Sequence, residues 1–238
     1  MKSLSIIVPC FNEYVRLYKN LPTIIEYCDA HLKDYELIFV NDGSKDSTLR
    51  LLQFYKPYNA RVKIITYTQN HGKGYAVRQG LKAATKELVL FMDADLATDL
   101  SCINDAINYA KKIELVHKDF ILVGNRELPD SKIVASPMRK FIGRTFNGLQ
   151  YLILGINVSD TQCGFKLMSK SVIPKIVEDL RIDGWAFDVE LLYLCKRNNV
   201  EIDCLPVIWH DVAGSKVHPL KDSFKMFNEL IRIKRIHG

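Results

Sequence analysis

The stretch Leu88–Leu96, Leu-Val-Leu-Phe-Met-Asp-Ala-Asp-Leu, runs from five consecutive apolar residues straight into two carboxylates. An apolar run this short, with no polar alternation, predicts a strand covered on both faces, as in a parallel sheet. Asp93 and Asp95 follow at its carboxyl end, where open α/β sheets bind their ligands. Neighbouring carboxylates repel each other unless a cation lies between them, and their oxygens suit Mg2+ or Mn2+. The alternative is a solvated turn, which an isolated Asp-x-Asp would favour.

Strand-like and helix-like segments alternate four times in the first hundred residues. The buried-strand patterns lie at Ser3–Val8, Tyr35–Val40, Arg61–Tyr67 and Glu87–Met92, with helical patterns after each of the first three. This alternation predicts an α/β fold with a Rossmann-like, mainly parallel sheet flanked by helices, because parallel neighbours need right-handed crossovers. We expect Pro9 to end the first strand.

The second half is less regular, but it contains no clean linker, internal repeat or low-complexity segment. A single domain is therefore expected. We divide it into a catalytic part at 1–215 and a basic amphipathic C-terminal helix at 216–238. Within the catalytic part, the donor-binding half is expected at about 1–125 and the acceptor half at about 126–215.

Composition narrows the class of protein. Of the 238 residues, 48% are hydrophobic and 25% are charged, which is typical of a globular protein with a substantial core. No apolar stretch approaches the ~20 residues of a membrane span, and the short run before Pro9 lacks the cleavage site of a signal peptide. Six scattered cysteines with no CxxC pair argue against a zinc site and favour a reducing cytosol.

The net charge of +6, with a pI near 8.9, fits anionic partners. Nucleotide phosphates, lipid phosphates and an acidic membrane surface all meet this description. The sequence has no helix-turn-helix, zinc-finger or RNP-type signature, so we expect no nucleic-acid partner.

Polar clusters follow three of the expected strands, at Asn12-Glu13, at Asp42 and at Asp93/Asp95. If the first, second and fourth strands are neighbours, these clusters share one rim of the sheet. Asp42 could then accept hydrogen bonds from a nucleobase, and Glu13 could hold ribose hydroxyls. Each acid taken alone could instead be a helix cap or a turn residue.

The segment Gly72-Lys73-Gly74 opens an expected helix, and it lacks the spacing of a Walker A loop. Its glycines still let the backbone approach a ligand closely. The free N–H groups of a helix N-terminus there would favour an anion. A glycine-rich turn with a surface lysine remains the alternative.

Four segments carry a family resemblance: Val8–Glu13 (Val-Pro-Cys-Phe-Asn-Glu), Asn41–Thr48, Asn70–Gly80 and Asp93–Asp95. Together they resemble the inverting family-two glycosyltransferases. The segments Asp160–Lys166 and Trp185–Leu191 resemble the branch with dolichyl-phosphate β-glucosyltransferases and polyprenyl-phosphate glycosyltransferases. The similarity reaches to about Lys216. It implies a nucleotide-sugar-binding fold of the GT-A type and metal-dependent, inverting transfer of a hexose.

The resemblance also implies roles for individual residues. The nucleoside part of the donor would be held by Pro9, Asn12, Glu13 and Asp42, with Lys73 nearby. Asp93 and Asp95 would bind Mg2+ or Mn2+ and the diphosphate. The transferred sugar or the acceptor phosphate would face Arg126, Arg139 and Gln162, and a closing loop would contain Ser215 and Lys216.

One departure from the family pattern bears on the donor. The mannosyl-phosphate branch usually has Gln two residues after the second metal-site Asp, and Ala97 stands there in this chain. This favours UDP-glucose or another UDP-sugar over GDP-mannose, which remains the alternative donor.

The acceptor decides whether a catalytic base is needed. A sugar hydroxyl must lose a proton during attack, and Asp188 or Glu190 would be the base for such an acceptor. A phosphate, with a second pKa of about 6, is already largely ionised at neutral pH. It needs charge compensation, which a basic set could supply: Arg126, Arg139, Lys140, Arg144, Lys166 and Lys216.

We therefore expect a polyprenyl phosphate oxygen to attack the anomeric carbon, with inversion. A saccharide or protein hydroxyl acceptor is the alternative, in which Asp188 or Glu190 would act as base. Both acids could otherwise belong to a helix start tied to nearby arginines. A catalytically silent nucleotide-sugar sensor is the competing class, and donor hydrolysis or transfer would exclude it.

The C-terminal helical pattern has one apolar stripe, formed by Leu220, Phe224, Phe227 and Ile231, with basic residues beside it. The stripe could lie on an anionic membrane surface or pack on the domain. We expect a cytoplasmic protein that meets its lipid acceptor at the cytoplasmic face of a membrane, by surface binding or through a membrane-anchored partner.

Overall fold

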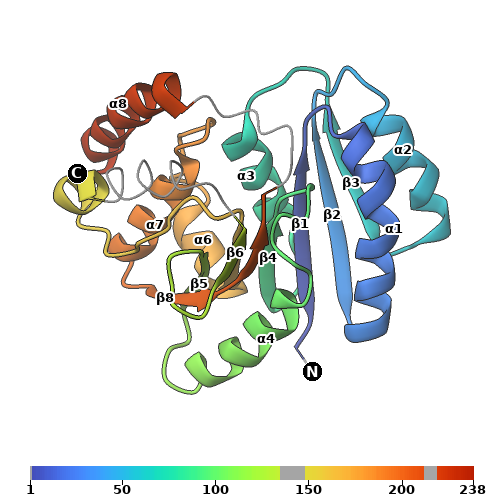
Figure 1. Cartoon of the computed structure of the whole chain (residues 1–238), viewed down its shortest axis with the longest axis horizontal. Helices are drawn as coiled ribbons and strands as arrows, with labels where there is room; N and C mark the ends of the chain where they lie inside the picture. The colour runs from blue at the N-terminus through green and yellow to red at the C-terminus, as the bar shows by residue number, and fades with distance from the viewer. Residues whose placement is uncertain (1, 135–147, 212–218) are drawn as a thin grey trace.

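The computed structural model describes residues 2–134, 148–211 and 219–238. Its main sheet has seven strands in the order β3-β2-β1-β4-β7-β5-β8 (Figure 1). The strands are β1 (Leu4–Cys10), β2 (Tyr35–Asp42), β3 (Val62–Tyr67), β4 (Leu88–Met92), β5 (Phe120–Asn125), β7 (Phe165–Ser169) and β8 (Glu201–Pro206). The pairs β3-β2, β2-β1, β1-β4 and β5-β8 are parallel, which confirms the mainly parallel α/β sheet.

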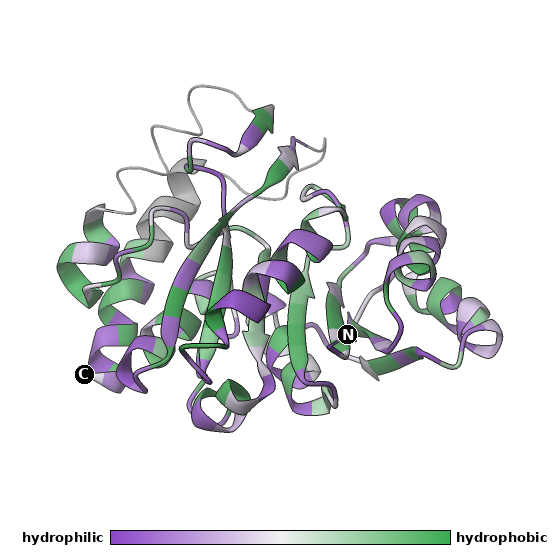
Figure 2. Cartoon of the chain, turned by 90° about the horizontal axis from the view of Figure 1, so that it is seen from below, coloured by the Kyte–Doolittle hydropathy of each residue, from purple (hydrophilic) through white to green (hydrophobic). Residues whose placement is uncertain are grey.

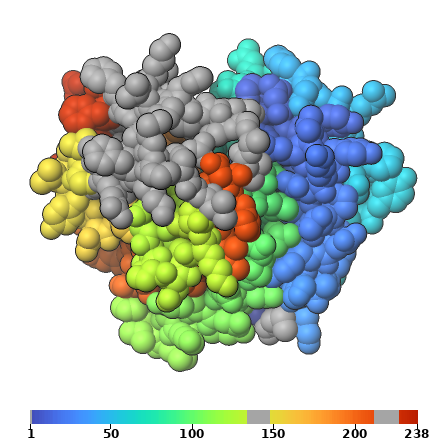
Figure 3. Space-filling view, viewed as in Figure 1, coloured from blue at the N-terminus to red at the C-terminus, as the bar shows by residue number. Residues whose placement is uncertain are grey.

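Helices cover both faces of this sheet. One hydrophobic cluster joins it to α1 (Tyr14–His31), α2 (Thr48–Tyr55) and α4 (Cys102–Ile113). The other joins it to α3 (Lys73–Ala83), α6 (Ile173–Ile176), α7 (Phe187–Arg197) and α8 (Pro219–His237). Two short 3-10 turns lie at Lys56–Tyr58 and Lys170–Val172. In the space-filling view, α1 and α2 lie on the right-hand side of the molecule (Figure 3).

The buried strands read as continuous apolar runs because successive side chains face opposite helical layers. In β1, Ile6 and Val8 belong to one hydrophobic cluster and Ile7 to the other. The central strands are accordingly coloured as hydrophobic between the mixed surfaces of the helices (Figure 2). A single domain follows, because Leu230 and Ile233 of the C-terminal helix α8 belong to the second cluster.

Two features of the sheet differ from the expectation. Strand β7 runs antiparallel between β4 and β5, so the sheet is mixed. A second, two-stranded sheet pairs β6 (Lys132–Val134) with β9 (Ile208–His210). A five-residue strand such as Phe165–Ser169 contains no signal of its direction, and three-residue strands have too little periodicity to be recognised.

The expectation that Pro9 ends the first strand was wrong. Strand β1 continues to Cys10, with Pro9 opposite Val40 of β2. On its other side, the pairing with β4 ends at Ile7 opposite Phe91. Pro9 therefore lies beyond the point where that neighbour would need its missing N–H group, which is a position where a strand tolerates proline.

The C-terminal part of α8 packs on the domain, whereas Ile231 of the expected stripe stays exposed. Leu230 and Ile233 are fully buried, and His237 is nearly so. Ile231, a member of the expected stripe, is 46% exposed. Arg232, Lys234 and Arg235 also lie on the exposed side of α8.

Candidate active site

The carboxyl ends of β2, β1 and β4 lie side by side, because β1 pairs in parallel with both of the others. The three polar clusters that follow these strands therefore share one rim of the sheet, as predicted. This rim also receives the N-terminus of α3, where Lys73 is the first helical residue. Residues far apart in the sequence are thereby brought to one site.

Asp42 organises the glycine turn that precedes α3. Its carboxylate accepts hydrogen bonds from the side chain of Asn70 (2.6 Å) and from the backbone N–H groups of His71 and Gly72 (both 2.8 Å). Gly72 has a φ of 108°, which only glycine adopts without strain. Asp42 thus fixes the start of α3, and its contact with a nucleobase stays a prediction.

Asn12 and Glu13 join the end of β1 to the loop after β2. Asn12, in the left-handed region at φ 53°, accepts a hydrogen bond from the backbone N–H of Lys45 (2.7 Å). The Glu13 carboxylate forms an ion pair with Arg16 (2.9 Å). Asp46 binds the N–H groups of Tyr14 and Thr48, so it ties together the starts of two helices. Donor contacts of Pro9, Asn12 and Glu13 stay predictions.

Lys73 connects the α3 end of the rim to the carboxylate pair. Its ammonium lies 2.6 Å from Oδ1 of Asp93. Burial alone would lower the pKa of Lys73, but Asp93, Asp188 and Asp95 together raise it, so the ammonium stays charged. Burial, and then the charge of Asp93, raises the pKa of Asp95. The two acids therefore repel each other at a site that already holds one cation.

Gly164 lies directly against Asp93. The backbone N–H of Asp93 donates to the carbonyl of Gly164 (3.1 Å). A Cβ atom on Gly164 would lie 1.9 Å from Oδ2 of Asp93, closer than any real contact. The position of the Asp93 carboxylate therefore depends on a glycine in the loop before β7.

The donor set at Asp93 and Asp95 fits a hard divalent cation that is shared with substrate. Within the described ranges, no three His, Cys, Asp or Glu residues form a metal cage. Mg2+ is usually held by one or two carboxylates together with substrate phosphates. Burial, and after it the charge of Asp93, raises the pKa of Asp95, and a cation between the two carboxylates would oppose that rise. Two carboxylates at this rim are thus suited to a metal that arrives with a diphosphate.

Arg126, which follows β5, is held rigidly by Asp160. Its Nε and Nη2 donate to the two carboxylate oxygens (2.7 and 2.9 Å), and its backbone N–H donates to the same group (2.9 Å). The guanidinium also lies 5.2 Å from the ring centre of Trp209. Burial would raise the pKa of Asp160, but Arg126 lowers it. Nη1 of Arg126 takes no part in this clamp, so it can serve a ligand.

Gln162 lies in the same loop, two residues from Gly164. Its Nε2 atom is buried and has no hydrogen-bond partner among the described residues. An unpaired buried amide costs free energy unless a ligand or water completes it. A bound substrate oxygen would do so, which agrees with the ligand contact predicted for Gln162.

Asp188, in the first turn of α7, forms a buried ion pair with Lys166 of β7. Lys166 is 0% exposed and Asp188 is 1% exposed. The ammonium of Lys166 also donates to the carbonyl of Cys163 (2.9 Å). Burial raises the pKa of Asp188, and Lys166 and Lys73 oppose that rise. The expectation that Lys166 contributes to acceptor binding was wrong, because its ammonium is enclosed and paired.

Glu190 is 0% exposed and is engaged in backbone contacts. It accepts hydrogen bonds from the N–H groups of Arg181 (2.9 Å) and Ile182 (2.8 Å), and from Nε2 of His237 (2.8 Å). Glu190 therefore ties the loop before α7 to the C-terminal helix. The alternative in which Glu190 belongs to a helix start tied to a nearby arginine is therefore confirmed, although the contact is with the backbone N–H of Arg181.

Several predicted acceptor residues lie outside the described residues. They are Arg139, Lys140, Arg144, Ser215 and Lys216. Their contribution to the site stays a prediction.

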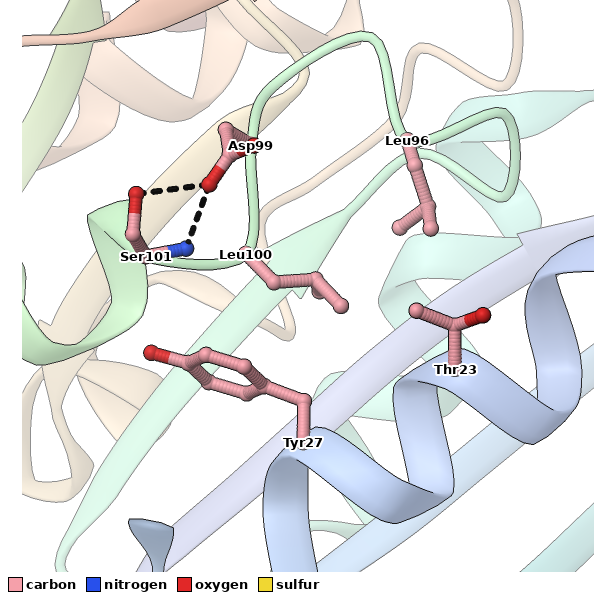
Figure 4. A pocket seen from close by; sticks show the side chains of 6 residues that line it. All are labelled: Thr23, Tyr27, Leu96, Asp99, Leu100 and Ser101. Atoms are coloured by element: carbon pink, nitrogen blue, oxygen red, sulfur yellow. Dashed lines mark hydrogen bonds between the residues drawn. The ribbon is translucent and has the colours of Figure 1, made fainter. Parts of the chain in front are cut away.

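A cavity of about 300 Å³ lies behind the loop that follows Asp95 (Figure 4). It is lined by Thr23 and Tyr27 of α1 and by the loop residues Leu96, Asp99, Leu100 and Ser101. Leu96 has a φ of 55°, an unusual conformation for leucine. The cavity borders the carboxylate pair without including it, so it is distinct from the rim site.

A family model described as "Glycosyl transferase family 2" matches residues 5–177, which include both the Asp93/Asp95 pair and Arg126. The chain belongs to glycosyltransferase family 2. The match covers well over half of the chain, and it contains every strand of the main sheet except β8.

Similarity over nearly the whole of this chain is found with dolichyl-phosphate beta-glucosyltransferases. The protein of that name from Dictyostelium discoideum is 35% identical over 240 residues, covering 97% of this chain and 73% of the relative. That from Saccharomyces cerevisiae is 34% identical, covering 97% and 74%. The human protein is 31% identical, covering 98% and 75%.

Solved structures of glycosyltransferases share the fold. Mannosyl-3-phosphoglycerate synthase from Rubrobacter xylanophilus matches with a TM-score of 0.68 at 16% identity, covering 98% of this chain and 72% of that one. Glucosyl-3-phosphoglycerate synthase from Mycobacterium tuberculosis, crystallised with Mn2+, UDP and glucosyl-3-phosphoglycerate, matches with a TM-score of 0.65, also at 16% identity, covering 98% and 78%. The expected GT-A fold is confirmed.

Two structural residues of the site had no assigned role in the sequence analysis: Gly164, which shapes the Asp93 position, and Asp160, which holds Arg126. A third residue, Lys166, was assigned to acceptor binding, but in the structure it pairs with Asp188. All three lie in Asp160–Lys166, the segment with the closer family resemblance. That resemblance was the only signal for their importance, because an acid in a loop and a lysine are ordinary residues when taken alone.

Proposed function

We propose that this glycosyltransferase transfers glucose from UDP-glucose to a polyprenyl or dolichyl phosphate, with inversion and with Mg2+ or Mn2+. The observation that carries the proposal is the similarity, over 97% of the chain, to enzymes named dolichyl-phosphate beta-glucosyltransferases. Because the name specifies a β-linked product, an α-linked nucleotide donor would require inversion.

The burial of two acids supports a phosphate acceptor over a hydroxyl acceptor. A general base must reach the proton that it removes. Asp188 is enclosed with Lys166, and Glu190 is saturated by backbone N–H groups and His237. Neither carboxylate is exposed to an incoming hydroxyl. A phosphate acceptor needs no such base, because it is largely ionised at neutral pH.

The donor side of the site contains groups that would compensate the negative charge of the diphosphate. A Mg2+ or Mn2+ ion held by Asp93 and Asp95 would supply positive charge to the departing diphosphate. The ammonium of Lys73 contributes a second positive charge from the N-terminus of α3. Together these two groups stabilise the charge that develops on the leaving group. The expectation that Gly72 and Gly74 let the backbone approach a ligand was wrong, because both glycines lie against the backbone of Asp183, and the carbonyl of Asp183 accepts the N–H of Gly74.

The acceptor side centres on Arg126. Its guanidinium is oriented by Asp160 and by the ring of Trp209, so it loses little conformational freedom on binding. We assign its free Nη1 to an oxygen of the acceptor phosphate. Arg139 and Lys216 are proposed as further contacts on the basis of sequence.

The preference for UDP rests on Ala97, which stands where the mannosyl-phosphate branch has glutamine. Structural neighbours include enzymes crystallised with UDP and with UDP-GlcNAc. GDP-mannose remains the second donor to test.

The test is a donor and acceptor panel. UDP-glucose, UDP-GlcNAc and GDP-mannose are incubated with a short polyprenyl phosphate, with and without Mn2+, and the products are resolved by mass spectrometry and NMR. We expect a β-linked glucosyl phosphate with UDP-glucose that forms only when the metal is present. Transfer to a free sugar hydroxyl but not to the lipid phosphate would refute the acceptor assignment.

We also propose that the protein works in the cytoplasm, peripherally on the cytoplasmic face of a membrane, since its acceptor is a lipid. Among the described helices, none has the length and apolar character of a membrane span. The outward basic residues Arg232, Lys234 and Arg235 of α8 suit an anionic surface. Sedimentation with vesicles containing phosphatidylserine at low salt tests this, and absence of binding there would contradict it.

A further inference from the structure

Trp185 places a large aromatic surface at the donor side of the rim. Its side chain is 48% exposed, whereas its helical neighbour Phe187 is buried. The ring centre of Trp185 lies 5.3 Å from the ammonium of Lys73. That ammonium in turn contacts Asp93. An indole is therefore held next to the groups that handle the diphosphate.

The backbone that carries Trp185 is fixed against α3. The carbonyl of Asp183 accepts a hydrogen bond from the N–H of Gly74 (2.8 Å). A Cβ atom on Gly72 would lie 2.4 Å from that carbonyl oxygen, so the two segments touch through bare backbone. Arg78 binds the carbonyl of Leu180 (2.7 Å) and the side chain of Asp183 (2.8 Å).

The same loop is fixed from behind by Glu190, through the N–H groups of Arg181 and Ile182. The exposure of Trp185 is thus built into a well-supported segment. An exposed indole on a rigid support loses little entropy when it binds a flat apolar surface.

The ligand next to this indole follows from the connectivity of a nucleotide sugar. In the donor, the hexose is bonded directly to the diphosphate. The acceptor phosphate is assigned to Arg126 beyond β5, and β7 separates that strand from β4 and Asp93. The hexose is therefore expected directly beside the groups that hold the diphosphate, between them and the acceptor phosphate, and Trp185 lies next to those groups. One face of a pyranose ring presents C–H groups, which suit the electron-rich face of an indole.

We infer that Trp185 is the stacking platform for the transferred hexose and contributes to donor specificity. This inference rests on the proposed function, because it takes the donor to be UDP-glucose. It assigns Trp185 to the sugar and leaves the nucleotide to the strand ends of β1 and β2.

The test compares sugar-dependent and nucleotide-dependent binding. Calorimetry with Mn2+ gives the Kd of UDP-glucose and of UDP for the unaltered protein, Trp185→Phe and Trp185→Ala. Aromatic contacts of this kind are worth about 0.5–1.5 kcal/mol, or roughly two- to tenfold in affinity. We expect Trp185→Ala to weaken UDP-glucose by that factor, Trp185→Phe to weaken it less, and both to leave UDP unchanged. Unchanged UDP binding also shows that the variants are folded.

Tyr58→Ala is the matched control, because Tyr58 is an exposed aromatic (78%) on the short helix after α2, remote from the rim. It should change neither Kd. A second readout is the intrinsic fluorescence of Trp185, which UDP-glucose should alter more than UDP does and which Trp185→Phe removes.

Three results would overturn the inference. The first is equal loss of UDP and UDP-glucose affinity in Trp185→Ala, and the second is no loss of either. The third is a raised KM for the polyprenyl phosphate with unchanged UDP-glucose binding, which would make the indole a lipid contact. Failure of the unaltered protein to bind UDP-glucose would instead refute the proposed donor, and the platform with it.

Discussion

Removing one partner of the buried Lys166–Asp188 pair distinguishes a structural acid from a catalytic one. Asp188→Asn leaves the Lys166 ammonium enclosed without its counter-charge, still donating to the carbonyl of Cys163. Breaking a buried pair in this way costs about 3–5 kcal/mol of unfolding free energy. For a chain of this size, that corresponds to a fall in Tm of roughly 10 °C.

Lys166→Met should cost less, because Asp188, whose pKa burial already raises, can take up a proton. The double variant Lys166→Met/Asp188→Leu removes both charges, and we expect it to recover most of the stability lost in Asp188→Asn. Urea unfolding followed by circular dichroism measures all three. The matched control is the exposed pair Lys175–Asp119, whose Lys175→Met variant should lose no more than about 1 kcal/mol.

The result that would refute this reasoning is an Asp188→Asn variant with unchanged unfolding free energy and abolished transfer. Asp188 would then act on the substrate as a base, and a hydroxyl acceptor would regain support. Reduced transfer that parallels reduced stability, and recovery of both in the double variant, would confirm Asp188 as a structural residue that does not act on the substrate.

Three further predictions follow from the site and the sheet. Gly164→Ala should lower metal-dependent transfer at least tenfold, because its Cβ would displace the Asp93 carboxylate, whereas Gly148→Ala, with nothing within 4 Å of its Cβ, should leave the rate unchanged. Asp95→Asn, or chelation of the metal by EDTA, should lower the transfer rate by roughly two orders of magnitude, and full transfer by metal-free Asp95→Asn would contradict the metal role. Burial would raise the pKa of Glu36, but hydrogen bonds from Lys63, Ser5 and Thr85 lower it from 4.5 to about 2. The resulting stabilisation of the fold, about 3 kcal/mol, is complete above pH 4.5 and is lost as the pH falls towards 2. Glu36→Gln should therefore reduce the loss of unfolding free energy between pH 4.5 and 2, measured by urea unfolding, and an unchanged loss would contradict the assignment.

The fold could be predicted because its determinants are local and repeated. Apolar runs at β1, β2 and β4 are covered on both faces, and each is followed by a helical pattern. The direction of β7 could not be predicted, because it depends on how residues 126–164 return to the sheet and not on any property of Phe165–Ser169. The burial of Leu230 and Ile233 in α8 was not predicted for a related reason, because it depends on the other elements of the second hydrophobic cluster, which the helix meets only in the folded chain.

The site likewise contains some residues whose roles could be predicted from the sequence and others whose roles could not. Asp93 and Asp95 were identified because both follow one strand, where the sequence itself fixes their separation. Lys166 was misassigned because a lysine in a sequence is by default a surface charge. The burial of Lys166 depends on its contact with Asp188, 22 residues away, and on the ring of Phe91, over which its ammonium lies.

The charges at the rim form one alternating series across four elements. Asp93 contacts Lys73, and Lys73 is influenced by Asp188, which pairs with Lys166. Asp93, Lys73, Asp188 and Lys166 thus alternate in sign, whereas Asp95 is partly buried and lies next to the like charge of Asp93. A divalent cation with a diphosphate would complete the series at Asp95. The series also explains why Lys73 stays protonated, because the charges of Asp93, Asp188 and Asp95 outweigh the effect of its burial.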